Sequence, residues 1–132
     1  MIKNRKLDHL GLFTPDLDKT ADWYCKVLGF RVIGDFIGEN GTKVRFIQND
    51  SGICYELISP ESADPSVFCG KIDHFSYVSE DIERDYQFCM EQGYVCTTGG
   101  VQDLKTFWEK GARYFKIQSP TGEEIEFCQV LK

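Results

Sequence analysis

The sequence predicts an α+β protein that contains two copies of one module, each made of a strand, a helix and three further strands. Two repeated motifs indicate the duplication: KLDHL at residues 6–10 returns as KIDHF at 71–75, and YEL at 55–57 returns as IEF at 125–127. The third observation is the order of hydrophobic patterns, because alternation and helical periodicity follow one another in the same succession in both halves.

The spacing of polar residues supports the same duplication. His9 and His74 are separated by as many residues as Asp16 and Asp81. The last motifs are further apart because the second copy carries a longer irregular stretch, Gly99–Gly111. Extra residues at one place, with the rest in register, are typical of a duplicated unit.

The chain is long enough for one domain with a substantial core. We expect a single domain over residues 1–132, made of a module at 1–62, a module at 71–132 and a linker at 60–70. The linker is indicated by its prolines, serine, aspartate and closing glycine, which favour turns over regular structure.

In the first module, an alternating pattern predicts a strand over residues 7–13. A helix follows, capped by Thr14 or Asp16 and stopped by Gly29. One helical face carries its apolar residues, which are Leu17, Ala21, Tyr24, Cys25 and Leu28. Three strands complete the module, separated by turns at Asn40-Gly41 and Asp50-Ser51-Gly52, and they are predicted over 30–37, 43–48 and 53–59.

The second module repeats this order. The predicted elements are a strand over 72–78, a helix over 81–92 stopped by Gly93, and strands over 94–98, 113–118 and 124–130. Gly99–Gly111 has no clear periodicity. It is interpreted either as a lid over a site or as a connection anchored by Phe107 and Trp108.

Composition narrows the classes of function. The formal net charge is −6 and the pI is about 4.9, without a stripe of Lys or Arg, so a nucleic-acid partner is not expected. No apolar run is long enough to span a bilayer, and none resembles a signal peptide. The six cysteines are scattered and are interpreted as reduced thiols of a cytoplasmic protein.

Two histidines and two glutamates form the leading candidate site. His9 and His74 are the only histidines, and Glu56 and Glu126 occupy matching places in the repeat. Strand alternation puts apolar neighbours on the opposite face of all four strands, so the four polar side chains share one kind of face. Buried carboxylates need a charge partner, and a divalent cation would supply it with two imidazoles completing four ligands. Such a set suits Ni, Zn, Co, Mn or Fe.

A simpler interpretation exists for each residue taken alone. A histidine on a strand more often makes a structural hydrogen bond than it binds a metal, and a glutamate near a strand end is more often solvated. The symmetry favours the metal site, because all four residues would otherwise coincide by chance.

These residues and motifs resemble the vicinal oxygen chelate superfamily, which includes glyoxalase I, methylmalonyl-CoA epimerase, extradiol dioxygenases and bleomycin-binding proteins. The supporting motifs are Leu7–Gly11, Trp23–Phe30 and Ser119–Glu126, the last with Ser119 where the family usually has Asp. The resemblance covers essentially the whole chain. It implies that the modules form a U-shaped, partly open barrel around a cleft, and that the protein is a homodimer.

The resemblance also implies a reaction. A His-Glu-His-Glu set is similar to that of nickel-type glyoxalase I, whereas the epimerase usually has Gln where Glu56 stands. We therefore expect a lactoylglutathione lyase-like enzyme that moves a proton next to a carbonyl through a metal-stabilised enediolate, with Glu126 as base and Glu56 as its counterpart. One Ni, Zn, Co or Mn ion is expected per site. The alternatives are an epimerase-like enzyme, a drug-binding protein without catalysis, and an iron oxygenase.

The substrate is expected to be a small carbonyl compound or thioester. Glyoxalase I has an Arg for glutathione four residues after the first His, and here that residue is Phe13. Substitutes for that cation are Arg45, Lys105, Lys110 and Arg113, although ordinary surface charges are the simpler interpretation. The residues expected to line the cleft are Phe13, Arg45, Cys54, Trp108 and Cys128, with both cysteines as packing thiols.

Overall fold

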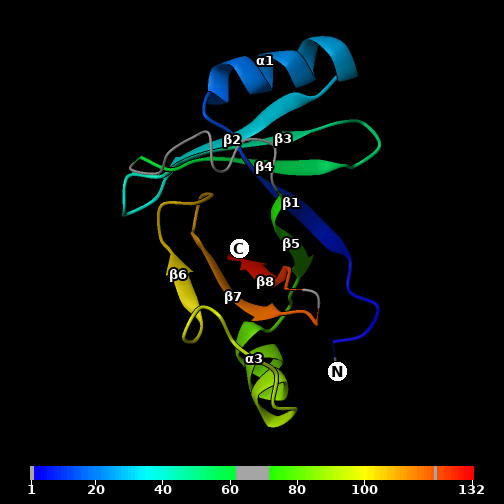
Figure 1. Cartoon of the computed structure of the whole chain (residues 1–132), viewed down its shortest axis with the longest axis vertical. Helices are drawn as coiled ribbons and strands as arrows, with labels where there is room; N and C mark the ends of the chain where they lie inside the picture. The colour runs from blue at the N-terminus through cyan, green and yellow to red at the C-terminus, as the bar shows by residue number, and fades with distance from the viewer. Residues whose placement is uncertain (1, 62–71, 121) are drawn as a thin grey trace. The chain divides into compact units, whose positions relative to one another are not determined.

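The computed structural model describes residues 2–61, 72–120 and 122–132, which form two compact units. The first unit is His9–Asp73, and the second is His74–Lys132 together with the N-terminal segment up to Asp8. Each unit combines one helix with β-strands, as Figure 1 shows, so the predicted α+β class is confirmed. The predicted linker at 60–70 lies outside the described residues except for Pro60 and Glu61.

The first unit has the predicted order of elements. In sequence they are β1 (Leu7–Phe13), α1 (Leu17–Leu28), β2 (Arg31–Ile37), β3 (Lys43–Gln48) and β4 (Cys54–Ser59). The strands lie in the order β2-β3-β4-β1. The pairs β2/β3 and β3/β4 are antiparallel, whereas β1 and β4 are parallel. In this register Glu56 faces Gly11 on one side and Phe46 on the other.

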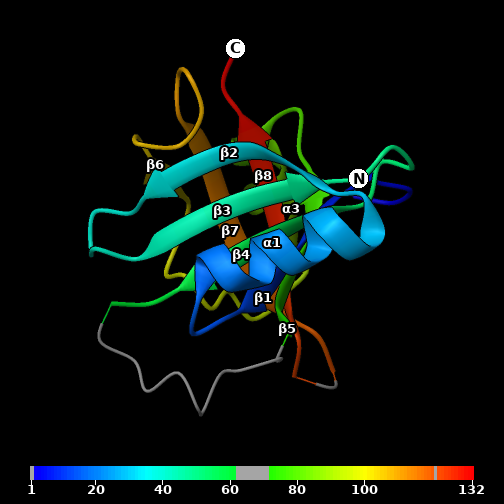
Figure 2. The same ribbon diagram turned by 90° about the horizontal axis from the view of Figure 1, so that it is seen from above.

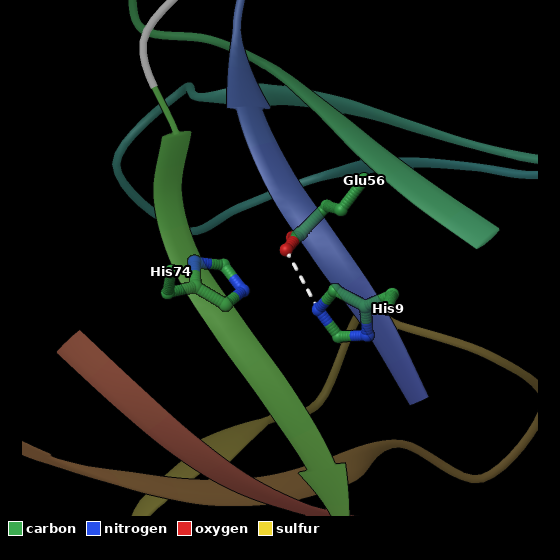
Figure 3. A group of neighbouring side chains, drawn as sticks. All are labelled: His9, Glu56 and His74. Atoms are coloured by element: carbon green, nitrogen blue, oxygen red, sulfur yellow. Dashed lines mark hydrogen bonds and ion pairs between the residues drawn. The ribbon is translucent and has the colours of Figure 1, made fainter. Parts of the chain in front are cut away.

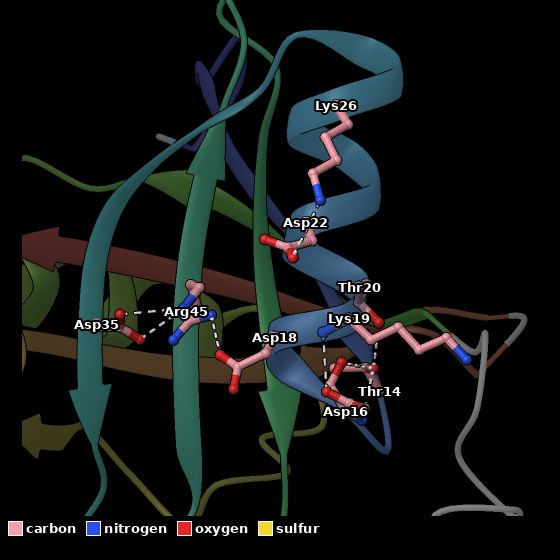
Figure 4. Close-up of polar contacts among 9 residues, drawn as sticks. All are labelled: Thr14, Asp16, Asp18, Lys19, Thr20, Asp22, Lys26, Asp35 and Arg45. Atoms are coloured by element: carbon pink, nitrogen blue, oxygen red, sulfur yellow. Dashed lines mark hydrogen bonds and ion pairs between the residues drawn. The ribbon is translucent and has the colours of Figure 1, made fainter.

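Local chemistry fixes both ends of α1. The Asp16 carboxylate caps the helix by accepting from the backbone N–H of Lys19 at 3.0 Å, as Figure 4 shows. Gly29 ends the helix with a φ of 72°, a left-handed conformation that glycine adopts without a steric penalty. Ala21 packs with Phe30, Ile47 and Leu57 between α1 and the sheet, and Figure 2 shows α1 lying across the strands.

The second unit has the same order of elements, but its edge strand is shorter. Its elements are β5 (Ile72–Val78), α3 (Ile82–Glu91), β6 (Gln102–Leu104), β7 (Ala112–Gln118) and β8 (Glu124–Val130). The strands lie in the order β5-β8-β7-β6, and its core holds Ile82, Cys89, Phe115 and Phe127. Here Glu126 faces Ser76 across the parallel pair and Lys116 across the antiparallel pair.

The N-terminal segment is tied to the second unit by a charged cluster. The Arg5 guanidinium donates to both carboxylate oxygens of Asp85, from Nη1 to Oδ2 at 2.7 Å and from Nη2 to Oδ1 at 2.6 Å. The Ser79 hydroxyl also donates to Asp85, and the backbone N–H of Val78 donates to the carbonyl of Lys6. Asp85 is 2% exposed, so its charge is compensated inside the protein.

The predicted strand at 94–98 is wrong. Only a single bridge between Cys96 and Ile117 forms there, and the edge strand is β6, which lies within the stretch predicted to be irregular. Gly93 has a φ of 77° and Gly99 one of 67°, so the backbone turns at both ends of the segment. Asp103 on β6 then pairs with Arg113 on β7.

Two smaller predictions about the first unit also need correction. Leu28 was expected on the buried face of the first helix but is exposed, because it lies in the last turn before Gly29. Phe30 was expected to begin the second strand, yet it precedes β2 and is buried in the core against Tyr24 and Tyr55.

No helix among the described residues is long and apolar enough to cross a membrane.

Candidate metal centre

The first unit brings His9 and Glu56 together. His9 lies on β1 and Glu56 on the parallel neighbour β4, and the His9 Nε2 atom is 3.1 Å from Glu56 Oε2, as Figure 3 shows. The two residues are 3% and 8% exposed. The Phe46 ring packs edge-to-face with the imidazole of His9, with ring centroids 5.1 Å apart and an interplanar angle of 85°. This pair is therefore held in a dry, partly aromatic setting.

The second unit brings His74 and Glu126 together in the same way. His74 lies on β5, as Figure 3 also shows, and Glu126 lies on the parallel neighbour β8. The distance from His74 Nε2 to Glu126 Oε2 is 3.6 Å, and the residues are 3% and 5% exposed. The Lys116 Nζ atom lies 3.5 Å from His74 Nδ1. This pair therefore has a cation where the first has an aromatic ring.

The predicted division of faces is confirmed in both sheets. Leu12, Tyr55 and Leu57 pack into the core with α1, and they alternate with Glu56 and its register partner Gly11. Tyr77 and Phe127 pack in the core of the second unit and alternate with Ser76 and Glu126. Because successive strand residues point to opposite faces, each His–Glu pair lies on the side away from its helix.

The geometry of each pair fits two ligands of one metal ion. Nitrogen and oxygen ligands bind such ions at about 2.1 Å, which puts neighbouring ligand atoms roughly 3.0–3.4 Å apart. The His9–Glu56 separation of 3.1 Å lies within this range, and the His74–Glu126 separation of 3.6 Å is slightly longer than it. The donor set is also suitable, since an imidazole and a carboxylate side by side are common ligands of divalent transition metals.

Arg45 holds α1 and β2 to β3. Its Nη1 donates to Asp18 on α1 at 2.8 Å and its Nε donates to Asp35 on β2 at 2.9 Å, as Figure 4 shows. Its hydrogen bonds raise the pKa of Arg45, and the bond to Asp35 has the larger effect, ahead of the bond to Asp18. The guanidinium is thus engaged by two carboxylates of its own unit.

Arg113 makes the matching contacts in the second unit. Its Nε donates to Asp103 on β6 at 2.8 Å and its Nη2 donates to Glu83 on α3 at 2.6 Å. Both arginines therefore brace a helix and an edge strand. The other cations considered for substrate binding, Lys105 and Lys110, are exposed.

The remaining residues predicted to line a cleft lie at several places in their own units. Cys54 and Cys128 are buried two residues from Glu56 and Glu126. Phe13 lines a cavity of about 500 Å³ beside Trp23 and Tyr24 of α1.

Trp108 lies between β6 and β7 and has a φ of 57°, a conformation uncommon for a large side chain. Its neighbour Phe107 is 5% exposed, as expected for an anchor of this connection.

Sequence reasoning missed two polar residues on the face of the second His–Glu pair. Ser76 is fully buried, and its hydroxyl has no hydrogen-bond partner among the residues that the structure describes. Lys116 is the antiparallel partner of Glu126, and its side chain is 15% exposed. The alternation of β5 already places Ser76 beside His74, but the register that brings Lys116 next to Glu126 depends on tertiary structure.

Comparison with known proteins agrees with this architecture. The sequence profile of the glyoxalase/bleomycin resistance protein/dioxygenase superfamily matches residues 8–111. A relative from Bacillus subtilis (strain 168), the uncharacterized protein YwbC, is 27% identical over 128 residues, which is 95% of this chain and 98% of that protein.

Solved structures show the same fold. Methylmalonyl-CoA epimerase from Mycobacterium tuberculosis superimposes with a TM-score of 0.81 at 20% identity, over 100% of this chain and 94% of that one. Streptomyces coelicolor methylmalonyl-CoA epimerase in complex with 2-nitronate-propionyl-CoA gives a TM-score of 0.78 at 19% identity, over 97% and 99%. With its two strand-helix-three-strand modules and the match over residues 8–111, the chain belongs to the glyoxalase/bleomycin resistance protein/dioxygenase superfamily.

Proposed function

We propose that this protein is a metal-dependent enzyme that moves a proton at a carbon next to a carbonyl, with His9, Glu56, His74 and Glu126 as the ligands of one divalent ion. The observation that carries the proposal is the duplicated pair: each unit buries one histidine beside one glutamate, with the ligand atoms 3.1 Å apart in the first unit and 3.6 Å apart in the second. A structural hydrogen bond would explain the His9–Glu56 pair by itself, but it would not explain why two buried carboxylates lie beside histidines on matching strands.

The chemistry of the ligand set points to a first-row transition metal. Two carboxylates balance the charge of a dication, and two neutral imidazoles complete four ligands, which suits Ni, Zn, Co or Mn. When bound, the ion supplies a Lewis acid that polarises the carbonyl oxygen and makes the neighbouring C–H bond more acidic. The buried setting of all four side chains keeps bulk water away from the reacting carbon.

Within this site we assign the proton transfer to Glu126, with Glu56 as its counterpart. The Glu126 carboxylate lies 3.6 Å from its histidine, whereas the Glu56 carboxylate lies 3.1 Å from its own. A carboxylate that takes and returns a proton must reach the substrate carbon, and we give this role to the carboxylate that lies farther from its histidine.

Two substrate classes fit this chemistry, and different observations favour them. Glu56 in the first pair matches the ligand set expected for a glyoxalase I-like lyase acting on a hemithioacetal. The likeness to solved methylmalonyl-CoA epimerases supports a thioester substrate. We place the lyase first because the argument for it rests on Glu56 of this chain. The epimerase comes second because the similarity to the solved epimerases is a similarity of fold.

A paired assay separates the two substrate classes. In the first assay, the metal-reconstituted protein is given the hemithioacetal of methylglyoxal and glutathione, and formation of the thioester is measured. In the second assay, it is given methylmalonyl-CoA in deuterium oxide, and hydrogen exchange at the α-carbon is measured. We expect turnover of one of them and none after removal of the metal. Tight binding of a small molecule without turnover of either would favour the binding-protein alternative.

The proposed assembly follows the family resemblance, and the proposed location follows the interpretation of the scattered cysteines as reduced thiols. We propose a cytoplasmic homodimer, which sedimentation of the purified protein and fractionation of its host cells would test.

A further inference from the structure

In each unit, three residues on adjacent strands are aligned in register, and the side chains at these matching positions differ between the two units. In the first unit the register aligns Gly11, Glu56 and Phe46 on adjacent strands. In the second unit the same register positions hold Ser76, Glu126 and Lys116. Side chains of cross-strand partners point to the same face. The second unit therefore adds a hydroxyl and an ammonium on either side of its buried glutamate, where the first unit has a hydrogen and a phenyl ring.

The Ser76 hydroxyl indicates a missing partner. It is fully buried and makes no hydrogen bond with any residue of the described ranges. A buried hydroxyl without a partner is destabilising, and most such groups in proteins bond to ordered water or to a ligand. Ser76 lies on the face of His74 and Glu126, so a ligand bound beside that pair would satisfy it.

The Lys116 ammonium is positioned by its own unit rather than free in solvent. Its Nζ lies 3.4 Å from Glu124 Oε2 and 3.5 Å from His74 Nδ1, and 5.9 Å from the centre of the Tyr114 ring. A cation at this place attracts an anion and repels a metal ion held by His74 and Glu126. A bound anionic group next to the ammonium would offset that repulsion.

We propose that Ser76 and Lys116 form an anion-binding pair that holds a carboxylate of the substrate beside Glu126. This inference rests on the proposed function, because it gives one end of the carbonyl substrate a negative charge. The Ser76 hydroxyl donates to a carboxylate oxygen and the Lys116 ammonium pairs with the charge. Gly11 and Phe46 offer no such groups at the matching positions of the first unit, so the anion-binding pair belongs to the second unit alone.

The test uses a monocarboxylate and its neutral isostere. Binding of propionate and of propionamide is followed by NMR titration in the metal-loaded protein and again after chelator treatment. We expect propionate to bind more tightly than propionamide, and Lys116→Met to weaken propionate by about tenfold or more, as for loss of a charged hydrogen bond. Ser76→Ala should weaken it several-fold.

Control variants separate this role from simple loss of charge or packing. Lys43→Met removes an exposed lysine from β3 and should leave propionate binding unchanged. Glu124→Gln removes the carboxylate that pairs with Lys116 and should leave propionate binding equal or tighter. Lys116→Arg should retain most of the affinity. If Lys116→Met does not fold, Lys116→Gln replaces it, with the same loss of affinity expected.

The outcomes distinguish this inference from the proposed function. Equal propionate affinity in Lys116→Met and Lys43→Met, or equal binding of propionate and propionamide, would overturn the anion-binding pair even if metal is retained. A different result is a protein that retains no metal but whose propionate affinity still falls in Lys116→Met. That result would support the anion-binding pair and overturn the proposed metal function.

Discussion

The Nε2 atom of His9 lies 3.1 Å from the Oε2 atom of Glu56, and both side chains are buried on neighbouring parallel strands. His74 and Glu126 repeat this relationship in the second unit at 3.6 Å. The 3.1 Å distance suits a hydrogen bond and equally suits two ligands of one ion. Variants that keep the shape but change the charge of each glutamate therefore test which role it has.

Glu126→Gln should lower kcat by about 10²–10⁴-fold while metal remains bound, because the amide keeps an oxygen ligand but cannot accept the substrate proton. The measurement is turnover together with metal content of the same sample. Glu56→Gln serves as the matched variant and should lower kcat less. Full turnover by the Glu126→Gln protein would remove the assignment of Glu126 as the base.

Arg5→Met should destabilise the protein by about 3 kcal/mol, because it leaves the buried Asp85 carboxylate with an uncompensated charge. Urea unfolding followed by circular dichroism gives the free energy of unfolding. Arg31→Met is the matched control, since its pair with Asp50 is exposed and should contribute about 0–1 kcal/mol. Equal losses in the two variants would show that the Arg5–Asp85 pair does not anchor the N-terminal segment.

Cys96 should be alkylated faster than Cys89 at pH 8. Burial alone would raise the pKa of Cys96, but hydrogen bonds from the Thr98 hydroxyl and from the backbone N–H groups of Thr98, Gly100 and Gly99 outweigh it and lower the pKa. Burial, and then the charge of Asp85, raises the pKa of Cys89 to about 11.

Because the thiolate is the reactive form, the rate at Cys96 should rise at lower pH than the rate at Cys89. Iodoacetamide labelling with peptide mass spectrometry measures both. Thr98→Ala should slow the reaction at Cys96, and an unchanged rate would contradict the role given to these hydrogen bonds.

Arg45→Met should lower the free energy of unfolding by about 1 kcal/mol and leave KM for the substrate unchanged, because its guanidinium is occupied by Asp18 and Asp35. Arg113→Met is the matched variant in the second unit and should behave alike. Thermal unfolding and steady-state kinetics provide the two readouts. A large rise in KM for Arg45→Met alone would restore Arg45 as a substrate-binding residue.

Much of the fold was predictable because local signals agreed with the tertiary structure. β1, β3, β5 and β8 match their predicted bounds, and α1 is capped by Asp16 and stopped by Gly29 as expected. The edge strand of the second unit was not predictable. β6 has only three residues, and it is stabilised by pairing with β7 and by the hydrogen bond that Arg113 donates to Asp103 rather than by its own hydrophobic pattern.

The four proposed ligands could be found from the sequence because the repeat places them at equivalent positions on alternating strands. Ser76 and Lys116 break that symmetry, so a search based on the repeat passes over them. The Arg5–Asp85 pair was also missed, since it joins residues 80 positions apart and Thr20 stands at the matching position of the first copy. Register and long-range pairing are properties of the folded chain.

The most direct test of the central claim is metal content by elemental mass spectrometry. The protein is loaded with nickel, cobalt, zinc or manganese and then desalted, and wild type is compared with His9→Ala and His74→Ala. If both His–Glu pairs bind a single ion, wild type retains one ion per chain and each variant loses it. No retained metal in wild type, or retention by either histidine variant, would contradict the account.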